Sequence, residues 1–233
     1  MDHEPERPLS GGWVTSGVVQ VGQTVRRPSS PNAPFVERLL DHLESTGFHG
    51  APRHLGFDEQ GREILTFIEG HVPSDCRDTV WSDDQLSAIA DLLRHFHDAT
   101  SRSEVAGGGE VVCHNDFGPW NLVWRDDLPV AIIDYDNAAP GARLDDLGYA
   151  TWKALNLGLV DTSVSEQRRR MTVFASAYGA ISDSTLLAAI ERAQERMRQV
   201  ITAAPAGAGR DDALDQNRRE RSWLAANRSY LVA

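Results

Sequence analysis

The stretch CHNDFGPWN (residues 113–121), followed by AIIDYD (residues 131–136), decides how the rest of this chain is interpreted. Asn121 follows Asp116 by five residues, and apolar residues stand on both sides of this polar loop, as short strands would. The second stretch begins with an apolar run that ends at Asp134, which is typical of a buried strand. A loop, a hairpin and a strand in this order would bring the two aspartates and the asparagine to one end of a small sheet.

The residue types at these offsets are those that phosphoryl transfer from ATP requires. The reaction needs a carboxylate that orients the attacking hydroxyl and takes its proton, and an acid and an amide oxygen that hold Mg²⁺. The pattern predicts Asp116 in the first role, and Asn121 and Asp134 in the second. Asp136 is either a further metal-binding or water-positioning acid or a structural residue. His114 either supports the loop through hydrogen bonds or takes part in the chemistry.

Three stretches, residues 114–121, 133–136 and 143–147, together resemble motifs of the aminoglycoside phosphotransferase (phosphotransferase enzyme) family. The chain has His-x-Asp where protein kinases have His-Arg-Asp, and its second motif reads Ile-Asp-Tyr-Asp instead of Asp-Phe-Gly. The similarity covers most of residues 9–150 and is most specific between residues 111 and 147.

This resemblance implies an α+β fold of the protein-kinase-like type with two lobes. We expect a small antiparallel-sheet lobe that binds the nucleotide over residues 9–70 and a mainly helical catalytic and substrate lobe over residues 71–233. Residues 1–8 are expected to be a disordered tail. Apolar periodicity and capping residues predict helices over residues 34–44, 82–99, 144–157, 163–178, 182–203 and 211–230.

The composition narrows the class of protein and its partners. The chain has 233 residues, 41% of them hydrophobic and 24% charged, which is typical of a soluble globular protein. Its net charge of −11 argues against a nucleic-acid partner. It has no apolar run long enough to span a membrane, a polar and acidic start unlike a signal peptide, and two cysteines that give no disulfide framework. We therefore expect a cytoplasmic protein without membrane partners, either a monomer or a homodimer.

Lys153 is the only lysine in the chain. The lysine with which a protein-kinase strand holds the ATP phosphates is therefore absent from the N-terminal half. Two strands are predicted around the turn at residues 22–23, and their alternation places Val25 and Arg27 on one face. Arg27 is thus the candidate phosphate-binding cation, because a guanidinium holds phosphate through paired N–H donors. The alternative is that Arg26 and Arg27 are both solvated edge residues.

The resemblance also implies contacts with the nucleotide from residues of the N-terminal lobe, namely Gly11, Gly12, Val25, Thr66 and Ile68. The two glycines would form the turn that covers the phosphates, although an ordinary hairpin is the alternative. The valine would pack against adenine. The last two residues lie at a strand end and in the hinge between the lobes, whose backbone would hydrogen-bond adenine.

Protein kinases pair the strand lysine with a glutamate on the first helix. Here Glu37 is the only glutamate near that place, and length matching puts Val36 closer to it. The sequence therefore favours the absence of this ion pair from the helix.

These features predict an ATP- and Mg²⁺-dependent phosphotransferase that acts on a hydroxyl of a small molecule. Residues 111–148 hold seven aspartates against two arginines, a net charge of −5, which favours a cationic, aminoglycoside-like acceptor and a part in antibiotic resistance. Choline, homoserine and other small alcohols are phosphorylated by similar enzymes and stay open as acceptors. A nucleotide-binding pseudokinase is the alternative from another class. The missing strand lysine favours it, and the intact Asp116, Asn121 and Asp134 oppose it.

Overall fold

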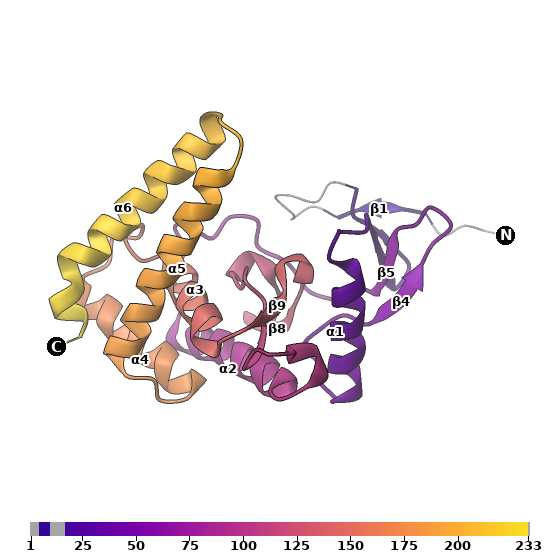
Figure 1. Ribbon diagram of the computed structural model, residues 1–233, viewed down its shortest axis with the longest axis horizontal. Coiled ribbons are helices and arrows are strands. Elements are labelled where there is room, and N and C mark those ends of the chain that lie inside the picture. The colour runs from indigo at the N-terminus through magenta and orange to yellow at the C-terminus, as the bar shows by residue number, and fades with distance from the viewer. Residues whose placement is uncertain (1–4, 10–16, 233) are drawn as a thin grey trace.

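An antiparallel sheet of five short strands makes up most of the N-terminal lobe in the computed structural model, which describes residues 5–9 and 17–232 (Figure 1). The strand order is β1-β2-β3-β5-β4. The bounds are Arg7–Pro8 for β1, Val19–Val21 for β2, Thr24–Arg27 for β3, His54–Phe57 for β4 and Glu63–Thr66 for β5. Strand β3 lies in the middle, and its pairing with β5 sets Val25 beside Leu65 and Arg27 beside Glu63.

Helix α1, Ala33–Ser45, lies between this sheet and the C-terminal lobe and contacts both β4 and α2. A proline in its first turn suits the start of a helix, because the missing N–H has no partner there in any case. Its apolar side chains recur at helical spacing and are buried: Ala33, Val36, Leu39, Leu40 and Leu43. The helix predicted over residues 34–44 is therefore confirmed.

Residues 67–71 connect the two lobes. The Phe67 N–H donates to the carbonyl of Gln23 at 2.8 Å, and His71 pairs with Trp124 of β7. Gly70 is required between them, because its φ is +148° and a Cβ there would lie 2.5 Å from the Trp124 carbonyl oxygen. The connection is thus fixed at both ends by backbone hydrogen bonds.

The C-terminal lobe is mainly helical. Its long helices are α2 Asp83–Thr100, α3 Arg143–Leu155, α4 Val164–Tyr178, α5 Asp183–Ala203 and α6 Ala208–Leu231. Serines cap α2, α4 and α5 by accepting a backbone N–H of the first turn, and in α2 the cap is a reciprocal capping box. Helices α5 and α6 form a hairpin that packs beside α3 and α4 (Figure 1). Gly148 lets α3 approach α5 closely, since a Cβ there would lie 2.4 Å from the Ala189 backbone.

Two small two-stranded sheets lie between the lobes and carry the polar loop. Strand β7, Leu122–Arg125, pairs with β8, Leu128–Ile132, as the sequence predicts. Strand β6, Val111–Cys113, pairs with β9, Ala139–Gly141. The Ala-Ala-Pro-Gly sequence of residues 138–141 predicts a loop, but residues 139–141 form a strand. Backbone pairing with β6, and not the residue types of this Ala-Pro-Gly stretch, makes it a strand.

The N-terminus also differs from expectation. Arg7 and Pro8 pair with Gln20 and Val19 of β2, so the expected disordered tail is wrong for these two residues. The open edge of the sheet offers backbone hydrogen-bonding groups that a neighbouring segment satisfies. Gly11 and Gly12 lie outside the described residues.

Within the part of the chain that the structure describes, no single helix combines the length and the hydropathy of a membrane span. Helices α4 and α5 together have the length and composition of a membrane span, but the pair is bent by 97°.

Candidate active site

Asp116 lies in the loop between β6 and β7, and both of its carboxylate oxygens are held by donors. Tyr149 of α3 donates its hydroxyl to Oδ1 at 2.7 Å, and the side-chain amide of Asn121 donates to Oδ2 at 2.9 Å. Burial and the neighbouring Asp116 charge raise the pKa of Tyr149, so the phenol stays protonated and can donate. The carboxylate is therefore fixed in orientation, as a group that positions an attacking hydroxyl must be.

Asn121 joins the two halves of the site through its side-chain amide. Its nitrogen donates to Oδ2 and to the backbone carbonyl of Asp116, both at 2.9 Å. Its Oδ1 accepts no hydrogen bond from residues 5–9 and 17–232. This oxygen is thus free to serve as a ligand, which is the role that the sequence predicts for it.

His114 is fully buried beneath the loop. Its Nε2 lies 3.0 Å from the Ile133 carbonyl oxygen, and its Nδ1 accepts the backbone N–H of Asp116 at 3.3 Å. Because Nδ1 accepts, Nε2 is the nitrogen that donates its N–H, to the Ile133 carbonyl. Since both ring nitrogens bind backbone groups, His114 supports the loop, and its place favours this role over proton transfer.

Asp146 of α3 anchors the same loop from below. The family resemblance implies that this residue supports the catalytic loop, with a helix-dipole role as the alternative, and its contacts favour the support of the loop. It is buried, and it accepts the backbone N–H groups of His114 at 2.5 Å and Asn115 at 2.8 Å. Its Oδ2 also lies 3.2 Å from Nε2 of His97. Burial opposes its charge, but the bonds from His97 and His114 outweigh this and hold the pKa of Asp146 below its ordinary value.

His97, Cys113 and Asp146 have ligand atoms within 4.8 Å of one another. This cluster does not suit a metal, because the two nitrogens of His97 bind Asp146 and Tyr178, and both oxygens of Asp146 are occupied. Burial also raises the pKa of the Cys113 thiol, which opposes the thiolate that a metal needs.

Arg27 of β3 reaches across from the N-terminal lobe to the two acids that follow β8. Its Nη1 lies 3.4 Å from Oδ1 of Asp134, and its Nη2 contacts Oδ2 of Asp136. Arg26 points to the other face of the strand, where it lies 3.9 Å from Asp58 and bonds Thr24. The strand register expected from the sequence therefore brings Arg27, Asp134 and Asp136 together.

Glu63 of β5 is the buried partner of Arg27 that the sequence analysis missed. Its Oε2 lies 3.3 Å from Nε of Arg27, its neighbour in the β3–β5 pair. Burial raises the pKa of Glu63, although the Arg27 charge works against this. Glu37 of α1 is half-buried and lies 3.8 Å from His54 instead. In the described residues Arg27 therefore pairs with a glutamate of the neighbouring strand and not with a glutamate of α1.

The acids after β8 have the chemistry of a metal site. Asp134 has a left-handed backbone with φ of +63°, which turns the chain at the end of the strand. Asp136 Oδ1 is buried and accepts no hydrogen bond from the described residues. Together with Oδ1 of Asn121, these carboxylates offer the hard oxygen ligands that Mg²⁺ prefers. The residues therefore fit the ion that the sequence analysis assigned to them.

The remaining residues predicted to bind the nucleotide are placed less decisively. Val25 is half-buried and shares a strand face with Arg27, and Ile68 is half-buried in the connection between the lobes. The hydroxyl of Thr66 already accepts the backbone N–H of Arg53 at 2.8 Å, so it is occupied within the sheet.

Most of the aspartates whose charge suggested a cationic acceptor already bind other groups of the protein. Asp126 and Asp127 are exposed in the β7–β8 turn, and Asp145 binds Arg196 at 2.6 Å. As described above, Asp146 holds the loop and the two acids after β8 bind Arg27. Of the seven aspartates in residues 111–148, only Asp116 faces a prospective acceptor without a cationic partner in the described residues.

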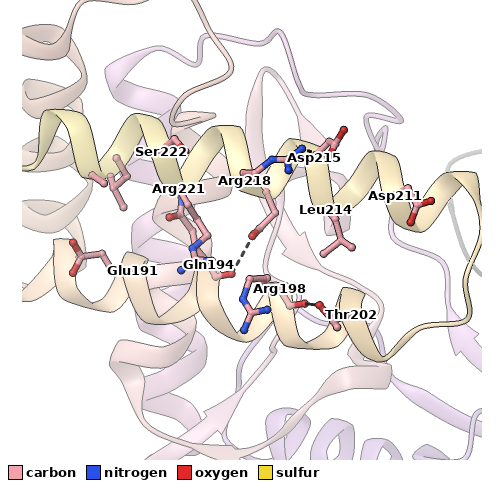
Figure 2. A pocket seen from close by; sticks show the side chains of 13 residues that line it. Glu191, Gln194, Arg198, Thr202, Asp211, Leu214, Asp215, Arg218, Arg221 and Ser222 are labelled. Carbon is pink, nitrogen blue, oxygen red and sulfur yellow. Dashed lines mark hydrogen bonds and ion pairs between the residues drawn. The ribbon is translucent and has the colours of Figure 1, made fainter.

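A hollow of about 840 Å³ lies elsewhere, between α5 and α6 (Figure 2). None of the residues predicted to bind nucleotide, metal or acceptor lines it. The charged side chains along it are ion-paired within the described residues, for example Arg218 with Asp215 and Arg221 with Glu195. We therefore place the active site at the loop between β6 and β7.

The comparisons with known proteins agree with this geometry. A family model described as the phosphotransferase enzyme family matches residues 83–180, which include the loop, Asp134 and Asp136. The trifolitoxin immunity protein of Rhizobium leguminosarum bv. trifolii is 31% identical to this chain over 97% of each sequence. The chain therefore belongs to the phosphotransferase enzyme family, and it is an enzyme of the small-molecule phosphotransferase class.

Solved structures share the fold at low sequence identity. A choline/ethanolamine kinase family protein from Mesorhizobium loti superposes with a TM-score of 0.61 at 13% identity, covering 94% of this chain and 88% of that one. A spectinomycin phosphotransferase in complex with ADP and spectinomycin gives a TM-score of 0.56 at 10% identity, covering 88% and 84%. These likenesses confirm the protein-kinase-like fold.

Arg27 is predicted to contact the nucleotide phosphates. Arg27→Ala should raise the KM for ATP by roughly tenfold or more, as expected for the loss of a charged hydrogen bond, while Arg26→Ala should change it little. Arg27→Lys should be only partly tolerated, because a point charge replaces a planar fork. The measurement is initial rate against ATP concentration. A larger effect of Arg26→Ala would show that the wrong arginine has been assigned.

Glu63 is predicted to position Arg27. Glu63→Gln keeps the shape of the side chain but removes the charge beside the guanidinium, so Mg-ATP should bind several-fold more weakly, as measured by titration calorimetry. Glu37→Gln is the matched control and should leave the affinity unchanged. Equal effects of the two substitutions, or a stronger effect at Glu37, would contradict the assignment of the pair to β5.

Proposed function

We propose that this enzyme transfers the γ-phosphate of ATP, with Mg²⁺, to a hydroxyl group of a small molecule. The observation that carries the proposal is the fixed carboxylate of Asp116. The acids after β8, Asp134 and Asp136, belong to the same site, and Arg27 reaches them from the opposite lobe. The spectinomycin phosphotransferase of similar fold, which was solved with ADP, supports the use of a nucleotide.

The proposed mechanism follows from these contacts. The acceptor hydroxyl donates its hydrogen bond to Asp116, which is oriented by Tyr149 and Asn121 and takes the proton as the oxygen attacks the γ-phosphorus. The bond to the β-phosphate oxygen breaks and ADP leaves. Arg27 holds the phosphates from the strand side. Asn121, Asp134 and Asp136 would hold Mg²⁺, which neutralises charge on the phosphates.

The relative suggests the biological role of the reaction. Because a trifolitoxin immunity protein is similar along nearly the whole chain, we propose that the acceptor is a toxic compound, and that its phosphorylation protects the cell. This role corresponds to the antibiotic-resistance function expected from the sequence. The cytoplasm, where ATP is available, is the proposed location.

An aminoglycoside-like, cationic acceptor stays a prediction from net charge. That argument is weakened because four of the seven aspartates are engaged within the protein and two more are exposed in the β7–β8 turn. The pseudokinase alternative rests on the missing strand lysine, and Arg27 supplies a cation in its place. Transfer from ATP to candidate hydroxyl compounds separates an active enzyme from a silent binding protein.

Asp116→Asn should lower the transfer rate by roughly 10²- to 10⁴-fold, because a neutral amide cannot take the hydroxyl proton. Binding of Mg-ATP should be nearly unchanged, since Asp116 is not among the proposed metal ligands. Asp127→Asn, in the exposed turn, is the matched control and should retain full activity. Transfer from γ-labelled ATP is the measurement, and near-normal turnover in Asp116→Asn would refute the assigned role.

Asp134→Asn should weaken the binding of Mg-ATP itself, because a metal ligand is lost. Saturation at about 100 times the Kd should stabilise the unmodified enzyme by roughly 2.7 kcal/mol, which a thermal shift detects. The shift should shrink strongly in Asp134→Asn. An undiminished shift would count against Asp134 as a ligand, and Asp116→Asn provides the comparison in which the shift is retained.

A further inference from the structure

Lys153, the only lysine of the chain, lies on α3 one turn beyond Tyr149. This i to i+4 spacing places the two side chains on the same face of the helix. The ammonium group of Lys153 lies 3.5 Å from the centre of the Trp152 ring and 5.9 Å from that of Tyr149. The lysine therefore stands beside the phenol that orients the catalytic carboxylate of Asp116.

The Lys153 ammonium makes no hydrogen bond and no ion pair with residues 5–9 and 17–232; its polar contact is with aromatic rings. Burial lowers the pKa of Lys153, and the charges of Glu220 and Asp116 oppose this effect. Lys153 is half-buried, and an ammonium that is partly shielded from water without a close counter-ion keeps three N–H donors that the described residues do not use. Such a group is suited to bind an anion that arrives with a ligand.

Glu220 of α6 is the acid that faces Lys153 from the neighbouring helix. It is buried, it accepts a hydrogen bond from Gln216 at 3.2 Å, and burial raises its pKa. It does not come within ion-pair distance of the lysine, so it offsets the charge only from a distance. The donors of Lys153 are left for another partner.

The position of Asp116 decides which molecule supplies that partner. An acceptor must place its hydroxyl at Asp116, and the rest of the acceptor then lies along the α3 face that carries Tyr149 and Lys153. The metal-site acids and Arg27 lie on the nucleotide side. The group that meets Lys153 therefore belongs to the acceptor and not to ATP.

We propose that Lys153 binds an oxyanion of the acceptor, a carboxylate or a phosphate group, and so selects acceptors with negative charge near the phosphorylated hydroxyl. This inference rests on the proposed function, because it assumes that an acceptor hydroxyl lies at Asp116. A zwitterionic acceptor fits it, whereas an acceptor with only cationic groups near the hydroxyl does not.

The uniqueness of Lys153 supplies a direct probe. Reductive methylation with ¹³C-formaldehyde keeps the charge of an amine and labels only this side chain and the chain's α-amino group. The labelled full-length protein, saturated with Mg-ADP, is titrated separately with glycolate, inorganic phosphate and ethanolamine, while the methyl resonance assigned by its loss in Lys153→Met is followed. Glycolate or phosphate should shift this resonance saturably, and ethanolamine should not. The anion that shifts it at lower concentration identifies the source of the oxyanion.

Variants complete the test. Their affinity for the anion that shifts the Lys153 resonance is measured by calorimetry on unmethylated protein. Lys153→Met should weaken the affinity by roughly tenfold or more, and Lys153→Arg should restore most of it. Arg192→Met removes an exposed cation of α5 and should have no effect. Mg-ADP binding shows that each variant is folded.

Absence of any shift in the Lys153 resonance, a shift with ethanolamine alone, or equal affinities in Lys153→Met and Arg192→Met would overturn the inference. Binding of Mg-ATP and transfer from it are followed on the same samples. If the nucleotide binds and is turned over while the anions leave Lys153 unperturbed, the inference alone fails. If an anion binds at Lys153 but Mg-ATP does not bind, the proposed function fails.

Discussion

The buried carboxylate of Asp146 is the constraint on which the active site depends. It accepts two backbone N–H groups of the catalytic loop and one bond from His97, so that a charge without access to water is fully satisfied. The same helix, three residues further on, presents Tyr149 to Asp116. One helix therefore fixes both the backbone of the loop and the direction of its carboxylate. Removing Asp146 would leave the N–H groups of His114 and Asn115 without this partner, which is why we regard it as a positioning residue.

On the proposed nucleotide side of the site, one ion pair of protein kinases is replaced by another. An arginine stands for the missing lysine, and its buried partner Glu63 comes from the adjacent strand and not from a helix. A partner within the same sheet is held by backbone hydrogen bonds on both sides. In the described residues Arg27 has no ion pair with α1 that a movement of this helix would make or break, because Glu37 lies against His54. We infer that the site is assembled without the helix rearrangement that kinases use for control.

The sequence predicted the features that depend on short-range spacing, and it missed those that depend on packing. The loop from His114 to Asn121 and the helix caps are local patterns, and the alternation of β3 correctly separated Arg26 from Arg27. Glu63 could be found only from the register of two strands distant in sequence. Pairing of β9 with β6 likewise depends on a backbone partner that residue types do not reveal. Lys153 was noticed for its uniqueness, but its place near Tyr149 and Asp116 follows from how α3 packs against the loop.

The central claim is that Asn121, Asp134 and Arg27 bind Mg-ATP opposite the carboxylate of Asp116. A crystal structure with Mg²⁺ and a non-hydrolysable ATP analogue tests it most directly. The account predicts the metal on Asn121 Oδ1 and Asp134, the phosphates against Arg27, and the γ-phosphate facing Asp116. A metal bound by His97 and Cys113, or a nucleotide in the hollow between α5 and α6, would contradict it.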